Sequence, residues 1–350
     1  MNRSREQGAG QVLVSRRARR VDRLWVAVLT AALTLLPAGA VLAQEDPDTD
    51  ASPAATGPFS LSLAVVDPDV PSVPLMEAAQ LLQEAGHDVT VEEVAEPELA
   101  IEGLVRGNFD VSGESISPAL IAIQQGAPIV VIGDVVANEW ALYAAEDISG
   151  CADLDGRRIG LFSEGAVATA MVREWIGQEC PDIEPEYLVI GGSDVRAQAL
   201  LAGEIDATAL TIADIAVLEQ EGTQVNLLAD FGESLPELRP SALYANANFV
   251  TENPEATTAF LEAVLEVHDQ INADPAYLVS IIQEHLPETD EAILDSVAAE
   301  YVERGLFDAA ALTEENLQFT IDFFTNAGVI EAGLVPADIA DLSYAEAARQ

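Results

Sequence analysis

The hydrophobic and polar positions of this chain follow two periods that alternate along most of its length. Short apolar runs predict buried strands, and apolar residues at every third or fourth position predict amphipathic helices. In the first part of the chain the pattern predicts strands at 60–66, 88–94, 109–112 and 128–136 and helices at 75–85, 97–106 and 118–125. Strands that alternate with short helices are typical of parallel βαβ units.

The same alternation starts again further along the chain. It predicts strands at 157–162, 187–190, 205–210 and 225–229 and helices at 166–178, 194–201 and 212–220. Beyond residue 251 the pattern is helical throughout, with helices predicted at 254–271, 275–285, 290–304 and 313–327. The sequence therefore predicts two similar α/β halves, joined by segments 139–146 and 241–250 and followed by a helical region.

The first 43 residues predict a segment that directs export. Seven arginines precede an apolar run at 24–36, and Pro37 and several small residues follow it up to Ala43. A basic head, an apolar core and small residues before a cleavage point are typical of a secretory signal peptide. We expect residues 1–43 to be cleaved, leaving an acidic linker at 44–58. An uncleaved anchor is the alternative, because the apolar run approaches the ~20 residues that span a bilayer.

The net charge of the chain mainly indicates which partners it does not bind. The chain has 15 basic residues, none of them lysine, against 60 acidic residues, which gives a net charge of −45. Loss of the arginine-rich segment 1–43 would bring this to about −50. Such a surface repels nucleic acid and anionic membranes and opposes self-association. We therefore expect no nucleic-acid partner and a monomer.

Residues that could carry catalysis are sparse. The absence of lysine excludes a Schiff base and a phosphate-loop lysine. His87, His268 and His285 lack the HExxH spacing of a zinc hydrolase. The segment GESIS at 113–117 begins like a GxSxG nucleophile elbow but ends on serine. We expect a protein that is not an enzyme and uses no metal and no cofactor; a secreted hydrolase with Ser115 as nucleophile is the enzyme alternative.

Four short motifs carry a resemblance to a known family. They are LVRGNFDV at 104–111, DLDGRRIG at 153–160, ALLAGEIDA at 199–207 and FVTENPEA at 249–256. In order and spacing they resemble segments of type 2 periplasmic solute-binding proteins of ABC importers. The similar branch binds nitrate, aliphatic sulfonates, taurine, and thiamine-pyrimidine or riboflavin-like compounds. The resemblance covers most of 59–327, and Arg157 and Arg158 stand where lysines are usual.

The resemblance implies two doubly wound α/β domains joined by two crossover strands, with a helical C-terminal extension on the first domain. Domain 1 would comprise 59–145 and 247–350, and domain 2 would comprise 146–246. The implied function is extracytoplasmic, in the periplasm or on the outer face of the cell membrane. There the protein would capture a small organic molecule in the cleft between the domains and deliver it to an ABC importer permease. A ligand-sensing subunit of a membrane signalling protein is the alternative.

In such a fold, ligands lie at the carboxyl ends of the strands, where the two sheets face each other. That rule selects the loops after the strands, and the crossover strands add two residues. The candidate ligand-binding residues are Asp67, Ser72, Glu114, Ser115, Ser117, Trp140, Ser163, Glu164, Gly165, Ala166, Ser193, Thr211, Asp214 and Asn246. The serines among them could equally be helix N-caps, and Trp140 could be a core residue.

The charge of these loops favours one class of ligand. Helix N-termini and Arg196 would suit an anion, but the four acidic candidates would repel one. We therefore expect a neutral or cationic nitrogen heterocycle, such as a pyrimidine precursor or flavin, rather than a sulfonate or nitrate.

The two cysteines of the chain predict a disulfide. Export favours oxidation of cysteines. Cys151 precedes the predicted strand at 157–162, and Cys180 follows the helix that returns alongside it. Both cysteines should lie at the same end of the domain, away from the cleft. We expect a Cys151–Cys180 bond.

Overall fold

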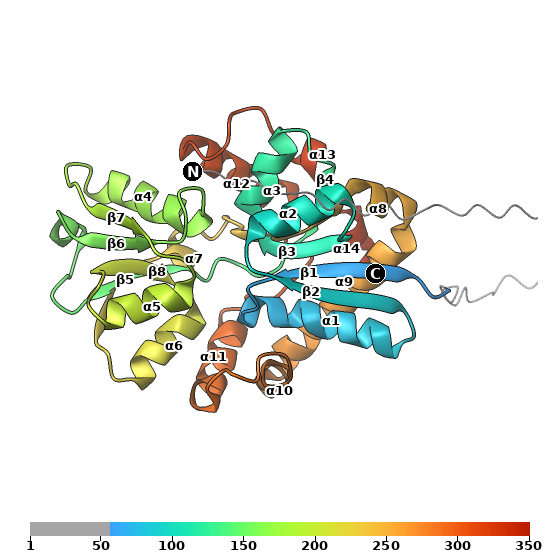
Figure 1. The fold of residues 1–350 in the computed structure, drawn as a ribbon, viewed down its shortest axis with the longest axis horizontal. Helices are drawn as coiled ribbons and strands as arrows, with labels where there is room; N and C mark the ends of the chain where they lie inside the picture. Colours follow the sequence, from blue (N-terminus) through green and yellow to red (C-terminus); the bar gives the residue numbers. More distant parts are fainter. Residues whose placement is uncertain (1–56) are drawn as a thin grey trace, which may run out of the picture. The chain divides into compact units, whose positions relative to one another are not determined.

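The computed structural model describes residues 57–350; the predicted signal peptide and nearly all of the linker lie outside this range. Two separate five-stranded sheets, shown in Figure 1, have the strand orders β2-β1-β3-β10-β4 and β7-β6-β8-β5-β9. The first contains β1 (Ser60–Val66), β2 (Asp88–Val94), β3 (Val111–Ser115), β4 (Ile129–Gly133) and β10 (Ser241–Asn246). The second contains β5 (Ala141–Ala145), β6 (Arg158–Leu161), β7 (Glu186–Val189), β8 (Ala207–Leu210) and β9 (Val225–Asp230).

Helices follow the strands in the order that the sequence predicts. We call the first sheet and its helices lobe 1, and the second sheet and its helices lobe 2. Lobe 1 carries a short 3-10 helix (Val70–Ser72), α1 (Val73–Glu84), α2 (Pro97–Arg106) and α3 (Ile116–Gln124). Lobe 2 carries a 3-10 helix (Cys151–Leu154), α4 (Val167–Glu179), α5 (Ser193–Leu201), α6 (Ile212–Gln220) and α7 (Phe231–Ser234). The predicted architecture of two α/β domains is confirmed.

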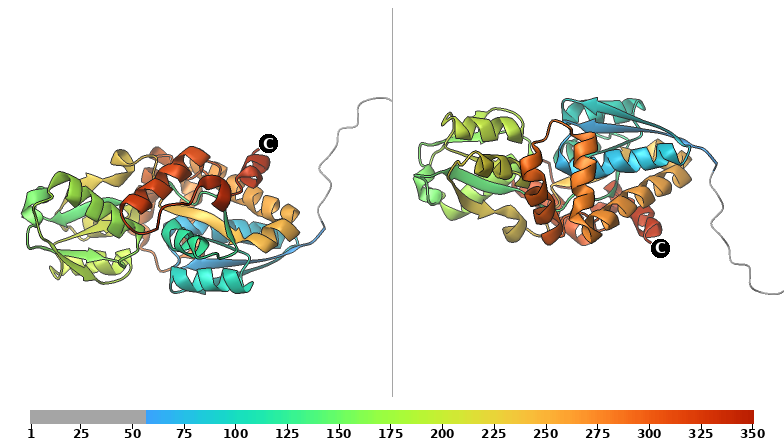
Figure 2. Two further views of the ribbon diagram at one scale, coloured as in Figure 1. Left: turned by 90° about the horizontal axis from the view of Figure 1, so that it is seen from above. Right: turned by 90° about the horizontal axis from the view of Figure 1, so that it is seen from below.

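The C-terminal region is helical and is built mainly on lobe 1, as predicted. It consists of α8 (Ala247–Glu252), α9 (Pro254–Ala273), α10 (Pro275–His285), α11 (Glu291–Glu303), α12 (Glu314–Asn326), α13 (Pro336–Ile339) and α14 (Ser343–Ala348). Helix α9 packs along α1, and α14 packs on α9 (Figure 2). Helix α11 differs from the expectation, because it also packs against α6 of lobe 2.

Each lobe contains the same turn from helix to strand. In lobe 1 the Asp110 carboxylate accepts the backbone N–H of Ser62 at 2.8 Å, and in lobe 2 Asp206 accepts that of Arg158 at 2.8 Å. Both pairs are 48 residues apart in the sequence. The aspartate therefore fixes the start of the neighbouring parallel strand, which explains why the motifs at 104–111 and 199–207 look alike.

Two chain segments connect the sheets, and an ion pair joins them. Asp134 follows β4, Arg239 precedes β10, and the carboxylate and guanidinium approach to 3.2 Å. Burial raises the pKa of Asp134 to about 7, although the charge of Arg239 opposes this. By sheet membership β5 belongs to lobe 2 and β10 to lobe 1. The domain boundaries expected at 145/146 and 246/247 stay a prediction, and sheet membership favours boundaries one strand earlier.

Several element boundaries differ from those predicted. The strand expected at 109–112 runs from Val111 to Ser115, and the helix expected to begin at Pro118 begins at Ile116. The strand expected to reach Val136 ends at Gly133, where the connecting segment starts.

The predicted disulfide is confirmed. Cys151 and Cys180 are bonded, with their Cα atoms 6.0 Å apart. The bond joins the 3-10 helix before β6 to the end of α4. Within residues 57–350, none of the helices has the length and apolar character needed to cross a bilayer.

Candidate functional site

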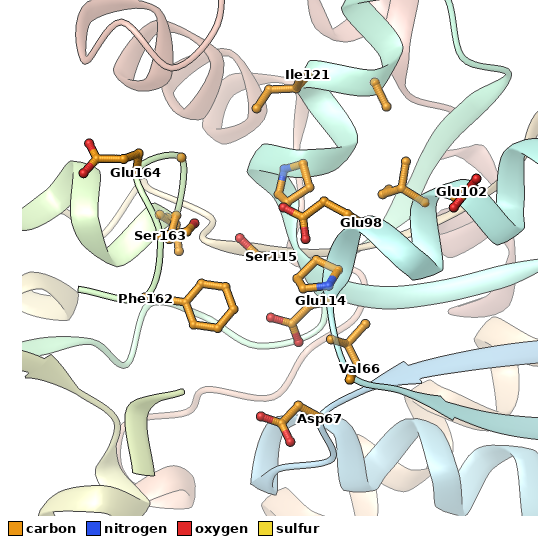
Figure 3. A pocket seen from close by; sticks show the side chains of 18 of the residues that line it. Val66, Asp67, Glu98, Glu102, Glu114, Ser115, Ile121, Phe162, Ser163 and Glu164 are labelled. Carbon is orange, nitrogen blue, oxygen red and sulfur yellow. The ribbon is translucent and has the colours of Figure 1, made fainter. Parts of the chain in front are cut away.

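A cavity of about 980 Å³ opens between the two lobes. The ends of β1 and β3 border it from lobe 1, and the loops after β6 and β7 border it from lobe 2. In Figure 3, Asp67, Glu114 and Ser115 enter the cavity from lobe 1, and Phe162 and Ser163 enter it from lobe 2. Its volume is at the upper end of the range of about 300–1,000 Å³ that is usual for small-molecule sites.

Most of the candidate residues line this cavity, as the strand-end rule predicts. They are Asp67, Glu114, Ser115, Trp140, Ser163, Glu164, Gly165, Ala166 and Ser193. Whether they contact a ligand stays a prediction.

Three candidates from the strand-end loops are instead used to cap helices. Ser72 lies in a 3-10 helix and is buried, with its backbone N–H bonded to Asp69. Thr211 and Asp214 form a capping box at the start of α6, in which each side chain accepts the other's backbone N–H. Their polar atoms are satisfied within the chain, and neither these two residues nor Ser72 lines the cavity. The loop rule does not separate capping from binding, so a ligand contact by these three residues stays an untested prediction.

The side chains of the other two candidates outside the cavity form hydrogen bonds to backbone carbonyls. The Asn246 side chain caps α8 and donates to the Leu104 carbonyl at 2.7 Å. The Ser117 hydroxyl donates to the Gly165 carbonyl at 3.0 Å, which is a direct contact between the lobes. Ser117 is fully buried, so it bridges the lobes beside the cavity.

Two helices form a part of the cavity that the strand-end rule does not predict. One face of α2 contributes Pro97, Ile101 and Val105, which are spaced by four residues. The facing side of α3 contributes Pro118 and Ile121, together with the residues beyond them along the helix. The strand-end rule selects only loops, and the one signal for this surface was the apolar stripe on each helix.

Carboxylates dominate the lobe 1 side of the cavity. Asp67 has a φ of 37°, and it is the only non-glycine residue with a positive φ in the described part of the chain. Burial raises the pKa of Glu114 to about 7, and the charge of Asp67 adds to this effect. The Glu114 side chain accepts no side-chain hydrogen bond from the described residues.

Asp69, which the candidate set omitted, adds a third carboxylate. Its carboxylate accepts the backbone N–H of Ser72, and desolvation raises the pKa of Asp69 well above the usual range. The charges of Glu114 and Glu139 act in the same direction. These carboxylates repel one another, so the cavity is poised to accept positive charge or protons.

Arg196 is the cation inside this acidic site. It is 2% exposed, and its guanidinium lies 5.9 Å from the Trp140 ring. It donates to the Thr208 hydroxyl at 3.0 Å and the Ala209 carbonyl at 3.1 Å, and also to the Gly191 carbonyl. Burial lowers the pKa of Arg196 to about 10, so it remains charged at neutral pH. Three of the five N–H groups of this arginine are therefore used by the chain itself.

Glu139 links the connecting segment to both lobes behind the cavity. Its carboxylate accepts the Tyr301 hydroxyl of α11 and the backbone N–H of Ile212 at the start of α6. Burial raises the pKa of Glu139 to about 7 despite these hydrogen bonds.

Ser115 is the nucleophile that the enzyme alternative would require. The Ser115 hydroxyl lies 3.4 Å from that of Ser117, and no histidine or carboxylate of the described residues accepts its proton. A serine without a base is a weak nucleophile.

Solved structures with the same architecture define the class of fold. The alkanesulfonate-binding protein SsuA from Xanthomonas axonopodis is 21% identical, with a TM-score of 0.66 over 82% of this chain and 100% of that one. The nitrate-binding protein NrtA from Synechocystis is 14% identical, with a TM-score of 0.68 over 83% of this chain and 88% of that one. The chain therefore has the fold of the periplasmic binding proteins.

The sequence comparison identifies the family. The model of the NMT1/THI5-like family matches residues 79–277. A binding protein of Brucella abortus is 24% identical over 246 residues, which cover 69% of this chain and 76% of that protein. This chain belongs to the NMT1/THI5-like family.

Proposed function

We propose that this chain is an extracytoplasmic solute-binding protein that captures a small organic molecule between its lobes and delivers it to an ABC importer. The cavity between the lobes is the observation that carries this proposal. Two lobes joined by short segments can rotate about them, and a ligand that contacts both lobes favours the closed arrangement. Proteins that share this fold include an alkanesulfonate-binding and a nitrate-binding protein. The role is binding and not catalysis.

Export from the cytoplasm fits this role. The N-terminal sequence has the organisation of a signal peptide, and a disulfide such as Cys151–Cys180 persists in oxidising compartments. The mature protein would begin at Gln44.

The charge of the cavity favours a neutral or cationic ligand, such as a nitrogen heterocycle, over a sulfonate or nitrate. An anion would meet Asp67, Asp69 and Glu114 in lobe 1. Arg196 is the cation that could compensate them, but most of its hydrogen bonds go to the chain. A protonated nitrogen would instead find carboxylates that form no ion pair within the described residues, and Trp140 and Phe162 offer aromatic faces to a ring.

The identity of the ligand can be tested directly. The protein is purified in its native state and denatured, and the released small molecules are identified by mass spectrometry. We expect a compound with a basic or neutral nitrogen ring and no sulfonate or nitrate group. A matched preparation of Glu114→Gln should release less of the same compound. Release of an alkanesulfonate by the native protein would overturn the ligand class, and saturable turnover of the released compound would overturn the binding role.

A further inference from the structure

The cavity is larger than a single ring requires, and its far end lies within lobe 1. Beyond Glu114 and Ser115 it continues between α2 and α3 as far as Arg106, the last residue of α2, and the segment 125–128 that follows α3. In Figure 3, Ile121 lies on the opposite side of the cavity from Asp67. One continuous cavity therefore joins an acidic end between the lobes to a groove between two helices.

The walls of this groove are apolar along matching faces. Pro97, Ile101 and Val105 recur every four residues on α2. On the facing side of α3, Ile121 and Ala122 follow Pro118 by three and four residues. Residues three and four apart share one face of a helix, so each helix presents a stripe to the groove. Val105 is 42% exposed, so part of its side chain is open to solvent.

Charged residues of α2 also line the groove. Glu98, Glu102 and Arg106 follow the neighbouring face of α2, and the last two are joined as an ion pair. Because Glu102 and Arg106 neutralise each other, the groove itself attracts apolar groups more than charge. This contrasts with the unpaired carboxylates at the other end of the cavity.

We propose that the ligand is amphiphilic, with a positively charged end at Asp67, Asp69 and Glu114 and an apolar extension in the groove between α2 and α3. This inference rests on the proposed solute-binding function and adds a second subsite to it. The continuity of the cavity fixes the order of the two parts along the ligand. The groove also acts as a specificity filter, because a small inorganic ion leaves it empty.

The test uses N-methylpyridinium and N-hexylpyridinium as probes, with binding to the full chain measured by calorimetry. Burial of each additional methylene should tighten binding by up to about fourfold. We expect the hexyl compound to bind at least ~10-fold more tightly than the methyl compound. Hexanesulfonate and methanesulfonate form the matched anionic series.

Two exposed residues of α2 provide matched variants. Val105 lines the groove, whereas Leu99, which is 46% exposed on the same helix, does not. Val105→Ser should weaken hexylpyridinium about threefold and leave methylpyridinium unchanged, and Leu99→Ser should affect neither probe. Ile121→Ser should weaken hexylpyridinium about 10-fold with the same selectivity.

The outcomes separate this inference from the proposed function. Equal affinity for the two pyridinium probes, or an equal loss of affinity for both in Ile121→Ser, would overturn the proposal that the groove binds part of the ligand. If hexanesulfonate alone binds and Ile121→Ser weakens it, the groove stands and the cationic end is overturned. If no probe of either series binds, the inference is overturned, and the molecules released from the native protein still decide the proposed function.

Discussion

At the scale of single residues, Glu114 sets the protonation state of the site. Its pKa of about 7 lies well above the ordinary value of 4.5 because burial disfavours the charged form. A glutamate with this pKa is half protonated near neutral pH. Capture of a cation by Glu114 therefore requires the loss of a proton over the range in which most solute-binding measurements are made.

The affinity for a permanent cation should thus depend on pH. N-methylpyridinium carries its charge at every pH, so only the protein titrates. As pH rises from 6 to 8, Glu114 loses its proton and the affinity should increase several-fold. Glu114→Gln should flatten most of this rise, with a remainder from Asp69, whose pKa is also raised. Glu92→Gln, an exposed residue of β2, is the control. Calorimetry at four pH values measures this affinity. If Glu114→Gln had the same pH dependence as the native protein, the assignment of that dependence to Glu114 would be contradicted.

At the scale of secondary structure, the alternation of strands and helices was predictable because buried parallel strands are apolar and their helices amphipathic. The predicted starts and ends of strands were wrong where the type of a residue suggests the wrong element. Phe109 looks like the start of a strand, but its ring lies under α2, where a Cβ on Gly103 would stand 2.2 Å from the ring. Glu114 and Ser115 look like a polar loop, yet they pair with β10 as the end of β3.

The candidate site was predictable to the extent that it lies at strand ends. Glu114 and Ser163 follow from topology alone. The cavity-lining faces of α2 and α3 could not be predicted from topology, because an apolar stripe that lines a cavity has the same sequence pattern as one that fills a core. Thr211 and Asp214 show the converse: their sequence pattern fits both a cap and a ligand contact, and the structure shows them as a cap.

The disulfide is an element-scale constraint on β6 and α4. It closes a loop with a sequence separation of 29 residues. In the chain-entropy model, closing such a loop stabilises the fold by roughly 3–4 kcal/mol. Replacing both cysteines by serine should lower the free energy of unfolding in urea by about that amount. Addition of reductant to the native protein should reproduce the loss, and no further loss should occur in the double variant. Equal free energies of unfolding for the native protein and the double serine variant would contradict this estimate.

At the scale of the whole molecule, net charge is the dominant property. With a charge of −45 on the full sequence, repulsion between acidic groups opposes the compact state, and salt screens this repulsion. The melting temperature should rise as NaCl increases from about 10 mM to 1 M, mostly below about 0.3 M, where the screening length shortens fastest. Glucose at equal osmolality controls for non-ionic effects. A melting temperature that is constant or falls with salt would show that the acids are already well compensated.

The Asp134–Arg239 ion pair has a consequence for how the lobes can turn. Each residue lies in a different one of the two segments that connect the lobes. If only one segment bent, the buried carboxylate and guanidinium would separate, which is strongly unfavourable away from water. We therefore expect the ion pair to favour movements in which the two segments bend together over movements in which only one of them bends.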